Sequence, residues 1–263
     1  MSSAQFLFLS PALPSELLTY ILNHHVYPTT LIICSSRAEF LASLVDDVHG
    51  GTTHTKGITS VEDEVEPRLP TIPPDIHGSN QAEQVRQHRL MSSPLYQIAT
   101  SRHIRVIYIP TVTHLRAYLS VFSPDDSRIP APPANFSSSG KYPPHVILYG
   151  FLEMHRDTSE WSAQGLSNSA SAAVDLGHRL SWQTIIVEPR TRSFAPSFED
   201  VLREPVPFLS GGGRKRGPDP EEGGWAGRTV EVGRILKRWF RFQQGEWDIS
   251  SDEDKMETSN DEI

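Results

Sequence analysis

The chain has 263 residues, which fits one large α/β domain or two small ones. Apolar residues make up 37% of it and there are 21 prolines, a balance that predicts a packed core with long disordered insertions. The only cysteine, Cys34, excludes an intrachain disulfide framework and fits a reducing, intracellular compartment. The net charge of −8 comes almost entirely from residues 246–263, which hold eight acidic residues and one lysine, so it neither supports nor excludes nucleic-acid binding.

We expect no membrane or secretion signal at the N-terminus. Its apolar run covers only Phe6–Leu9 and has no basic flank, which is too short for a signal peptide. No other stretch is long and apolar enough to cross a bilayer. We therefore expect no membrane association.

The first elements alternate between strand and helix. Two short apolar runs predict strands, and each is followed by a capping serine and apolar residues at helical spacing. In chain order we expect a strand at Phe6–Leu9, a turn at Ser10–Pro14, a helix capped by Ser15, a strand at Thr30–Cys34, and a helix through Phe40 and Val45 that Ser35 or Ser36 caps.

This pattern stops near Val48. From there to about residue 84 the chain is rich in acidic residues and proline, a composition that cannot bury enough apolar surface to order itself. We predict a disordered insertion at about 48–84, with a helix resuming near Gln84.

The alternation then continues. We expect a helical turn at Leu95–Ala99, a strand at Ile104–Ile109, a helix from Thr113 to Phe122, and a Pro- and Ser-rich disordered loop at 123–142.

The centre of the fold is a strand–helix–strand unit. His145–Tyr149 and Gln183–Val187 are short apolar runs without clean alternation, which is typical of parallel strands buried on both faces. The Ala- and Ser-rich segment Ser159–Leu180 between them supplies the crossover helix that parallel neighbours require. The sequence therefore predicts an α/β fold with a mainly parallel sheet flanked by helices.

Beyond Pro189 the pattern weakens. The last elements we expect are a short helix around Phe198–Leu202, a flexible Gly-rich insertion at 210–226, a helix from Val232 to Trp239, a strand near Trp239–Phe242, and an acidic disordered tail at 246–263. Residues 1–245 are thus predicted to form a single domain.

The positions that carry chemistry in nucleotide-binding α/β proteins hold the wrong residues here. A phosphate-binding first turn needs glycines and a lysine, but Ser10–Glu16 has neither, and it contains two prolines and a repelling Glu16. At the end of the central strand, Tyr149 stands where a carboxylate would hold Mg²⁺. Glu153 lies near enough to substitute, but its place at a loop start favours a surface role.

This arrangement resembles the RecA-type recombinase superfamily in degenerate form. "FLFLSPALPSELL" stands in place of the phosphate loop, and "HVILYGFLE" in place of the acidic strand, where Gly150 is kept and the preceding Asp is lost. The long small-residue helix before "TIIVEP" is also similar, and the likeness covers roughly Phe6–Val187. It implies a RecA-like core without ATP motifs, as in Shu-type recombination mediators and other recombinase paralogues, or in the accessory ring of Elongator, which serves tRNA modification.

Other reactive side chains form no predicted site. His24 and His25 lie at a helix end, and His49 and His54 have no cysteine or carboxylate at metal-ligand spacing. Cys34 ends a strand as a small buried hydrophobe without a partner base. We predict no catalytic residue, no metal and no cofactor.

Two basic groups are the candidate contact residues. Arg214, Lys215 and Arg216 lie in the Gly-rich insertion, where they form either a solvated loop, a contact to nucleic-acid phosphate or a nuclear-import patch. The second group is interleaved with aromatic residues, so that it either binds single strands by stacking and charge or is the solvated face of a helix whose Ile235, Leu236 and Trp239 are core; its members are Arg234, Lys237, Arg238 and Arg241. Trp225 and Trp247 flank this piece as candidate anchors for a partner protein.

The sequence thus predicts a non-enzymatic accessory factor in homologous recombination and DNA repair. It would act as a scaffold in a hetero-oligomer of recombinase-paralogue type, with possible DNA contact, in the nucleus or alternatively the cytoplasm. A structural subunit of an Elongator-like tRNA-modification complex is the alternative. A doubly wound small-molecule enzyme is the third, and the missing glycine-rich turn and catalytic cluster argue against it.

Overall fold

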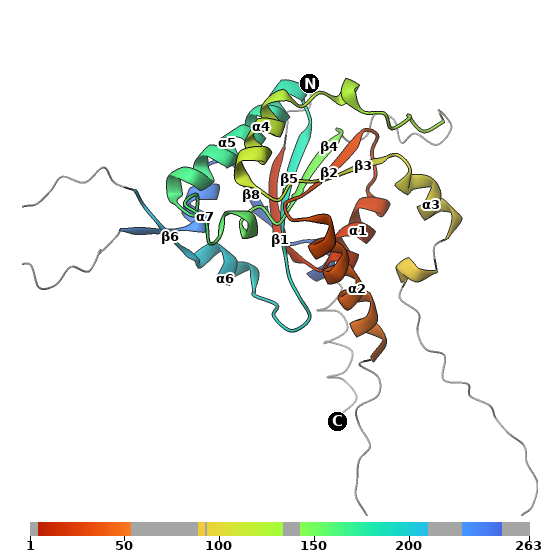
Figure 1. Cartoon of the computed structure of the whole chain (residues 1–263), viewed down its shortest axis with the longest axis horizontal. Coiled ribbons are helices and arrows are strands. Elements are labelled where there is room, and N and C mark those ends of the chain that lie inside the picture. Colours follow the sequence, from red (N-terminus) through yellow and green to blue (C-terminus); the bar gives the residue numbers. More distant parts are fainter. Residues whose placement is uncertain (1–4, 54–88, 93, 134–142, 210–227, 249–263) are drawn as a thin grey trace, which may run out of the picture.

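A six-stranded sheet forms the centre of the molecule. The computed structural model describes residues 5–53, 89–92, 94–133, 143–209 and 228–248. The strand order is β3-β2-β4-β5-β1-β8 and every neighbouring pair is parallel (Figure 1). The strands are β1 Phe6–Ala12, β2 Thr29–Ile33, β3 Ile104–Tyr108, β4 His145–Tyr149, β5 Gln183–Pro189 and β8 Arg241–Gln243.

Helices cover both faces of this sheet. Figure 1 shows α1 and α2 on one side and α4 and α5 on the other, and the two buried clusters divide in the same way. The predicted α/β class with a parallel sheet flanked by helices is therefore confirmed. The helices are α1 Pro14–Asn23, α2 Arg37–Thr53, α3 Leu95–Ser101, α4 Val112–Val121, α5 Ala163–Leu180, α6 Phe198–Arg203 and α7 Val232–Leu236, with 3₁₀ turns η1 Arg89–Met91, η2 Pro124–Asp126 and η4 Glu153–His155.

The central strands are buried on both sides, as their apolar runs predict. In β2, Leu31 packs on the side of α1 and α2, whereas Ile32 packs on the side of α4 and α5, and both are fully buried. Such strands have no solvent face, which explains why their sequences do not alternate between polar and apolar residues.

Small residues let α5 lie close against the sheet. A Cβ atom at Gly177 would lie 2.6 Å from both Phe6 Cε1 and Thr184 Oγ1, well inside contact distance. Ala170 and Ala173 are also fully buried on this helix. The Ala- and Ser-rich composition therefore reflects close helix–sheet packing.

Several predicted boundaries in the first half are wrong. β1 continues through the predicted turn to Ala12, since Ala12 pairs with Pro189 of β5. The insertion predicted from residue 48 begins later, because α2 runs to Thr53 and the Arg192 side chain packs against Gly50. Tertiary contacts here override the low helix propensity of the glycines.

Two helix caps also differ from the prediction. α1 begins at Pro14, with Leu13 at its N-cap, so Ser15 lies inside the first turn. Thr111, rather than Thr113, caps α4 by accepting a hydrogen bond from His114 N. The predicted cap of α2 at Ser36 is confirmed, since Ser36 Oγ accepts from Glu39 N.

The loop predicted as disordered at 123–142 is partly ordered against the core. Tyr27 donates its hydroxyl hydrogen to Ile129 O, and His103 Nδ1 donates to Pro130 O. These contacts fix residues 123–133, while 134–142 lie outside the described residues, as do residues 54–84, Gln84 included, and the insertion at 210–226.

The C-terminal part differs most from the sequence-based expectation. α7 ends at Leu236, and an antiparallel ribbon that the sequence did not indicate joins β6 Pro205–Pro207 to β7 Thr229–Glu231. The predicted acidic tail begins too early, because Glu246–Asp248 form a helical turn packed on the core. The remaining tail lies outside the described residues.

Candidate functional site

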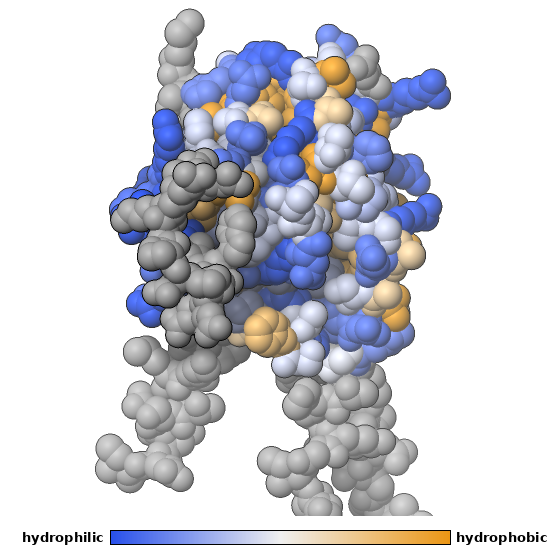
Figure 2. Space-filling model, turned by 60° about the vertical axis from the view of Figure 1, so that its left-hand side comes forward, coloured by the Kyte–Doolittle hydropathy of each residue, from blue (hydrophilic) through white to orange (hydrophobic). Residues whose placement is uncertain are grey.

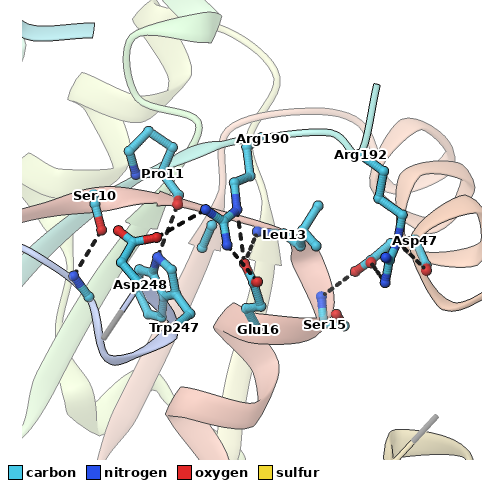
Figure 3. A network of polar contacts seen from close by, with 12 residues as sticks. Ser10, Pro11, Leu13, Ser15, Glu16, Asp47, Arg190, Arg192, Trp247 and Asp248 are labelled. Atoms are coloured by element: carbon cyan, nitrogen blue, oxygen red, sulfur yellow. Dashed lines mark hydrogen bonds and ion pairs between the residues drawn. The ribbon is translucent and has the colours of Figure 1, made fainter. Parts of the chain in front are cut away.

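The end of β1, just before the chain turns into α1, is covered by the C-terminal end of the described chain. Trp247 is only 9% exposed, and its Nε1 donates to Pro11 O at 3.0 Å (Figure 3). Gly245 N donates to Ser10 Oγ at 2.8 Å. The structure thus corrects the expectation that Trp247 anchors a partner protein, because this side chain anchors the chain's own end; Trp225 lies outside the described residues.

Arg190, just after β5, links this C-terminal segment to α1. Its guanidinium donates to both carboxylate oxygens of Glu16, at 3.1 and 2.6 Å, and to Asp248 Oδ1 at 3.0 Å (Figure 3). All three side chains are less than 30% exposed. A bidentate pair in such a partly buried place holds its geometry firmly.

At the start of α1, backbone N–H groups already donate hydrogen bonds to carboxylates of the chain itself. Leu13 N donates to Glu16 Oε2 at 2.7 Å, and Ser15 N donates to Asp47 Oδ2 at 2.9 Å (Figure 3). Asp47 is 4% exposed, and Arg192 Nε donates to its carbonyl oxygen. The N-terminus of a helix attracts anions through such N–H groups. Here the carboxylates of Glu16 and Asp47 take the place of such an anion.

Tyr149, the last residue of β4, also bonds to the end of β1. Its hydroxyl donates to Ala12 O at 2.9 Å, and the residue is 4% exposed. Burial, followed by the nearby Glu188, raises the pKa of this phenol, so it stays protonated and remains a donor. The residue in the expected acid position therefore ties two strands together. Glu153 is exposed and pairs with Arg156, in agreement with the surface role predicted for it.

Glu188 is a buried carboxyl that sequence reasoning overlooked. It lies near the end of β5, is 3% exposed, and accepts hydrogen bonds from Leu152 N at 2.7 Å and Glu153 N at 3.3 Å. Burial raises its pKa to about 8, against the opposing effect of these bonds and of Arg156. A signal was present, since Glu188 directly follows a buried run at the carboxyl end of a parallel strand, where ligands of such sheets bind.

A cavity of about 760 Å³ lies beside Glu188. It is bounded by η4, by the connection from β5 to α6, and by α6 itself. Its lining residues are Glu153, Arg156, Glu188, Pro189, Thr191, Phe194, Pro196, Asp200, Val201, Arg203, Glu204 and Pro205.

The predicted basic residues divide between described and undescribed parts of the chain. Arg214, Lys215 and Arg216 lie outside the described residues. The other four are exposed on α7, the turn after it and β8, and within the described residues no salt bridge is formed by Arg234, Lys237, Arg238 or Arg241.

The aromatic and apolar residues of this piece belong to the core. Leu236 is fully buried, and Ile235, Trp239 and Phe242 pack against the cluster beneath α5. The geometry of this piece therefore matches the second interpretation, in which the basic residues form a solvated face and the apolar residues belong to the core. Arg238 lies 5.3 Å from the centroid of the Trp239 ring.

Histidine and cysteine take structural positions. His24 pairs with Glu246, and His25 donates to the His103 carbonyl oxygen. Cys34 is 4% exposed, and burial followed by the charge of Glu188 raises its thiol pKa. Within the described ranges, no three histidine, cysteine, aspartate or glutamate residues are grouped as metal ligands. Those ranges also contain no helix with the length and apolar character needed to span a membrane.

Apolar side chains are exposed mainly around the edge strand β3. A hollow of about 490 Å³ lies there between α1, α2, η1 and β3. β3 pairs with β2 alone among the described strands. We call this the β3 surface, and the exposed apolar residues that line its hollow are Val45, Met91 and Val106. The side bearing α5 and α6 differs, since Figure 2 shows apolar residues there only in small groups among polar ones.

Comparison with known proteins gives little further information. No family model and no curated protein matches the chain. Among solved structures, a similar chain belongs to a DnaB-like replicative helicase, described with its interactions with primase. The two are 11% identical, the match covers 72% of this chain and 40% of the helicase chain, and the TM-score is 0.33. The assignment of fold class therefore rests on the sheet itself.

Proposed function

We propose that the chain is a non-catalytic, RecA-like accessory factor in homologous recombination and DNA repair, working in the nucleus as a scaffold within a hetero-oligomer. The observation that carries this proposal is the closed turn between β1 and α1. There Glu16 and Asp47 already accept hydrogen bonds from the backbone donors that a phosphate group would need.

Nucleotide binding at this turn would require several bonds to break together. A phosphate would have to displace two carboxylates and would then face their negative charge at short range. Trp247 and the pair of Arg190 with Glu16 would have to move as well. Because internal contacts occupy this turn, nucleotide binding there is disfavoured. We therefore place the function in contacts with other macromolecules.

The β3 surface supports a scaffold role. An edge strand with unpaired backbone groups, next to exposed apolar side chains, is a template for association with another chain. Val45 is 49% exposed on α2 and Val106 is 44% exposed on β3, and both line the apolar hollow. We assign the recombinase-paralogue partner to this surface.

Affinity purification of the full chain, with identification of its partners, tests the proposal. The double variant Val45→Glu, Val106→Glu places two charges on the β3 surface and should lose recombinase-type partners. Val121→Glu is the matched control, because Val121 is 73% exposed on α4, on the opposite face of the sheet. This control should retain the partners.

Each other outcome has a clear meaning. If Elongator subunits copurify with the wild-type chain and are lost in the double variant, the function is tRNA modification and not recombination. Equal loss of recombinase-type partners in both variants, or their absence from the wild-type sample, would contradict the proposal.

A further inference from the structure

The cavity beside Glu188 has an excess of negative side chains. Four carboxyl groups line it, from Glu153, Glu188, Asp200 and Glu204, against the guanidinium groups of Arg156 and Arg203. Arg156 is already engaged by Glu153 and Glu204, and Arg203 pairs with Glu199 outside the cavity. Among the described residues neither Asp200 nor Glu188 forms an ion pair, although Asp200 Oδ2 already accepts hydrogen bonds from Ser197 N and Ser197 Oγ.

The walls of the cavity suit a long side chain with a planar charged end. Pro189, Pro196, Val201 and Pro205 provide apolar surface against which methylene groups can pack. Phe194 also lines the cavity and is 71% exposed, so most of its side chain is accessible to a cation. A guanidinium that stacks on this exposed ring would cover it.

We propose that this cavity is a docking site for an arginine side chain of a partner protein. The guanidinium lies between Phe194 and the carboxyl groups of Asp200 and Glu188, and the methylene stem lies along the proline-rich wall. The inference goes beyond the scaffold function and does not rest on it, since the cavity is separate from both the closed first turn and the β3 surface.

Protonation of Glu188 makes binding at this site depend on pH. Its carboxyl is held by two backbone N–H groups, and burial keeps it largely protonated near neutral pH. An incoming guanidinium favours the ionised carboxylate, so binding releases a proton and strengthens as pH rises from 7 to 9. Burial raises the pKa of nearby Cys34 and Tyr149, which therefore keep their protons in this range. The other charged groups around the cavity are Glu153, Arg156, Asp200, Arg203 and Glu204.

The test uses the full chain labelled with ¹⁵N and titrated with N-acetyl-arginine amide. The amides of Leu152 and Glu153 donate to Glu188, so their resonances report directly on its carboxyl group. We expect these resonances to shift saturably, with a Kd of about 1 mM that decreases by up to about tenfold between pH 7 and pH 9. N-acetyl-citrulline amide, which has the same shape without the charge, should cause no such shift.

Three variants test the assignment of residues. Glu188→Gln should weaken binding by about tenfold and abolish its pH dependence. Phe194→Ala, at an exposed position that leaves folding intact, should weaken it by about threefold. Asp175→Asn is the control, because Asp175 is an exposed acid on α5 that does not line the cavity.

The contradicting results are equally specific. Absence of a saturable shift, equal shifts with citrulline, or unchanged affinity in Glu188→Gln and Phe194→Ala would each overturn the proposal. The chain's own Arg214, Lys215 and Arg216 are an alternative occupant. If the probe binds only when these three are replaced by alanine, the cavity holds a basic side chain of the chain itself and the partner proposal is wrong.

Discussion

At the scale of single residues, the buried carboxyl of Glu188 gives stability a pH dependence near neutral pH. Its pKa is about 8 in the folded protein and 4.5 for an ordinary glutamate, so the native state retains a proton that the unfolded chain releases between these values. The free energy of unfolding therefore falls as pH rises through this interval. Below pH 6.5 buried His145, whose pKa burial lowers to about 4, acts in the opposite direction. The effect of Glu188 is thus clearest from pH 6.5 to 8.

We predict that the free energy of unfolding declines between pH 6.5 and 8 by up to about 1.4 kcal/mol per pH unit. In Glu188→Gln, which mimics the protonated acid, this decline should be lost. Urea denaturation at several pH values measures it, with Glu199→Gln as the exposed control. A wild-type profile that is flat or rising, or the same decline in Glu188→Gln, would show that Glu188 is not protonated in the fold.

Tyr149 gives a second prediction at this scale. Removing its hydroxyl in Tyr149→Phe deletes the bond to Ala12 O and should reduce the free energy of unfolding by about 1 kcal/mol. The loss is modest because Ala12 O also accepts from Arg190 N. Tyr108→Phe, on the edge strand β3 two strands away from β4, is the comparison and should change stability by less than half as much. If both variants lost the same amount of stability, the hydrogen bond from Tyr149 to Ala12 O would have no special stabilising role.

At the scale of elements, the C-terminal turn around Trp247 acts as a clamp on the start of α1. Trp247→Ala should lower the free energy of unfolding by about 3 kcal/mol, because it removes a buried indole and the partner of Pro11 O. Trp247→Phe keeps a ring and should cost about 1 kcal/mol. Native-state hydrogen exchange adds a local readout. The amides of Gly245 and Ser15 should exchange faster in the alanine variant, and unchanged exchange there would contradict the clamp.

The basic face of α7 and β8 gives a prediction about nucleic acid. Replacing Arg234, Lys237, Arg238 and Arg241 by alanine should weaken single-stranded DNA binding and reduce its salt dependence, because fewer phosphate contacts release fewer counterions. Arg37→Ala with Arg102→Ala is the control, since both residues are exposed on the other side of the sheet. Fluorescence anisotropy at two salt concentrations measures the effect. Equal losses in both sets would rule out a specific contact at this face.

The strand–helix alternation could be predicted because each element contains its own signal. Apolar runs such as His145–Tyr149 and caps such as Ser36 are local, and they place the central strands correctly. What sequence reasoning missed depends on contacts between distant residues. The extension of α2 requires Arg192, and the role of Trp247 requires Pro11, which lies more than two hundred positions away.

The candidate site was predictable only in part. The absence of glycine and lysine from Ser10–Glu16 predicts a turn without a phosphate cradle. Only the structure shows that Asp47 accepts a hydrogen bond from Ser15 N there and that Arg190 pairs with Glu16. The charge of Glu188 was visible in the sequence. Its burial was not, because burial depends on how η4 folds over the end of β5.

At the scale of the whole molecule, the described residues present three separate regions. The carboxyl edge of the sheet is closed at β1, hollow beside β5, and separate from the apolar β3 surface. A nucleotide machine needs the first of these open. The proposed scaffold role requires the other two to be accessible.

Nucleotide binding by the full chain tests the central claim most directly. In a titration with a fluorescent ATP analogue and Mg²⁺, followed by competition with unlabelled ATP, we predict no saturable binding up to about 1 mM. Glu16→Ala combined with Trp247→Ala is the informative companion, since it removes a carboxylate and the clamp from the first turn. Saturable binding by the wild-type chain that ATP displaces would contradict the account of a closed first turn.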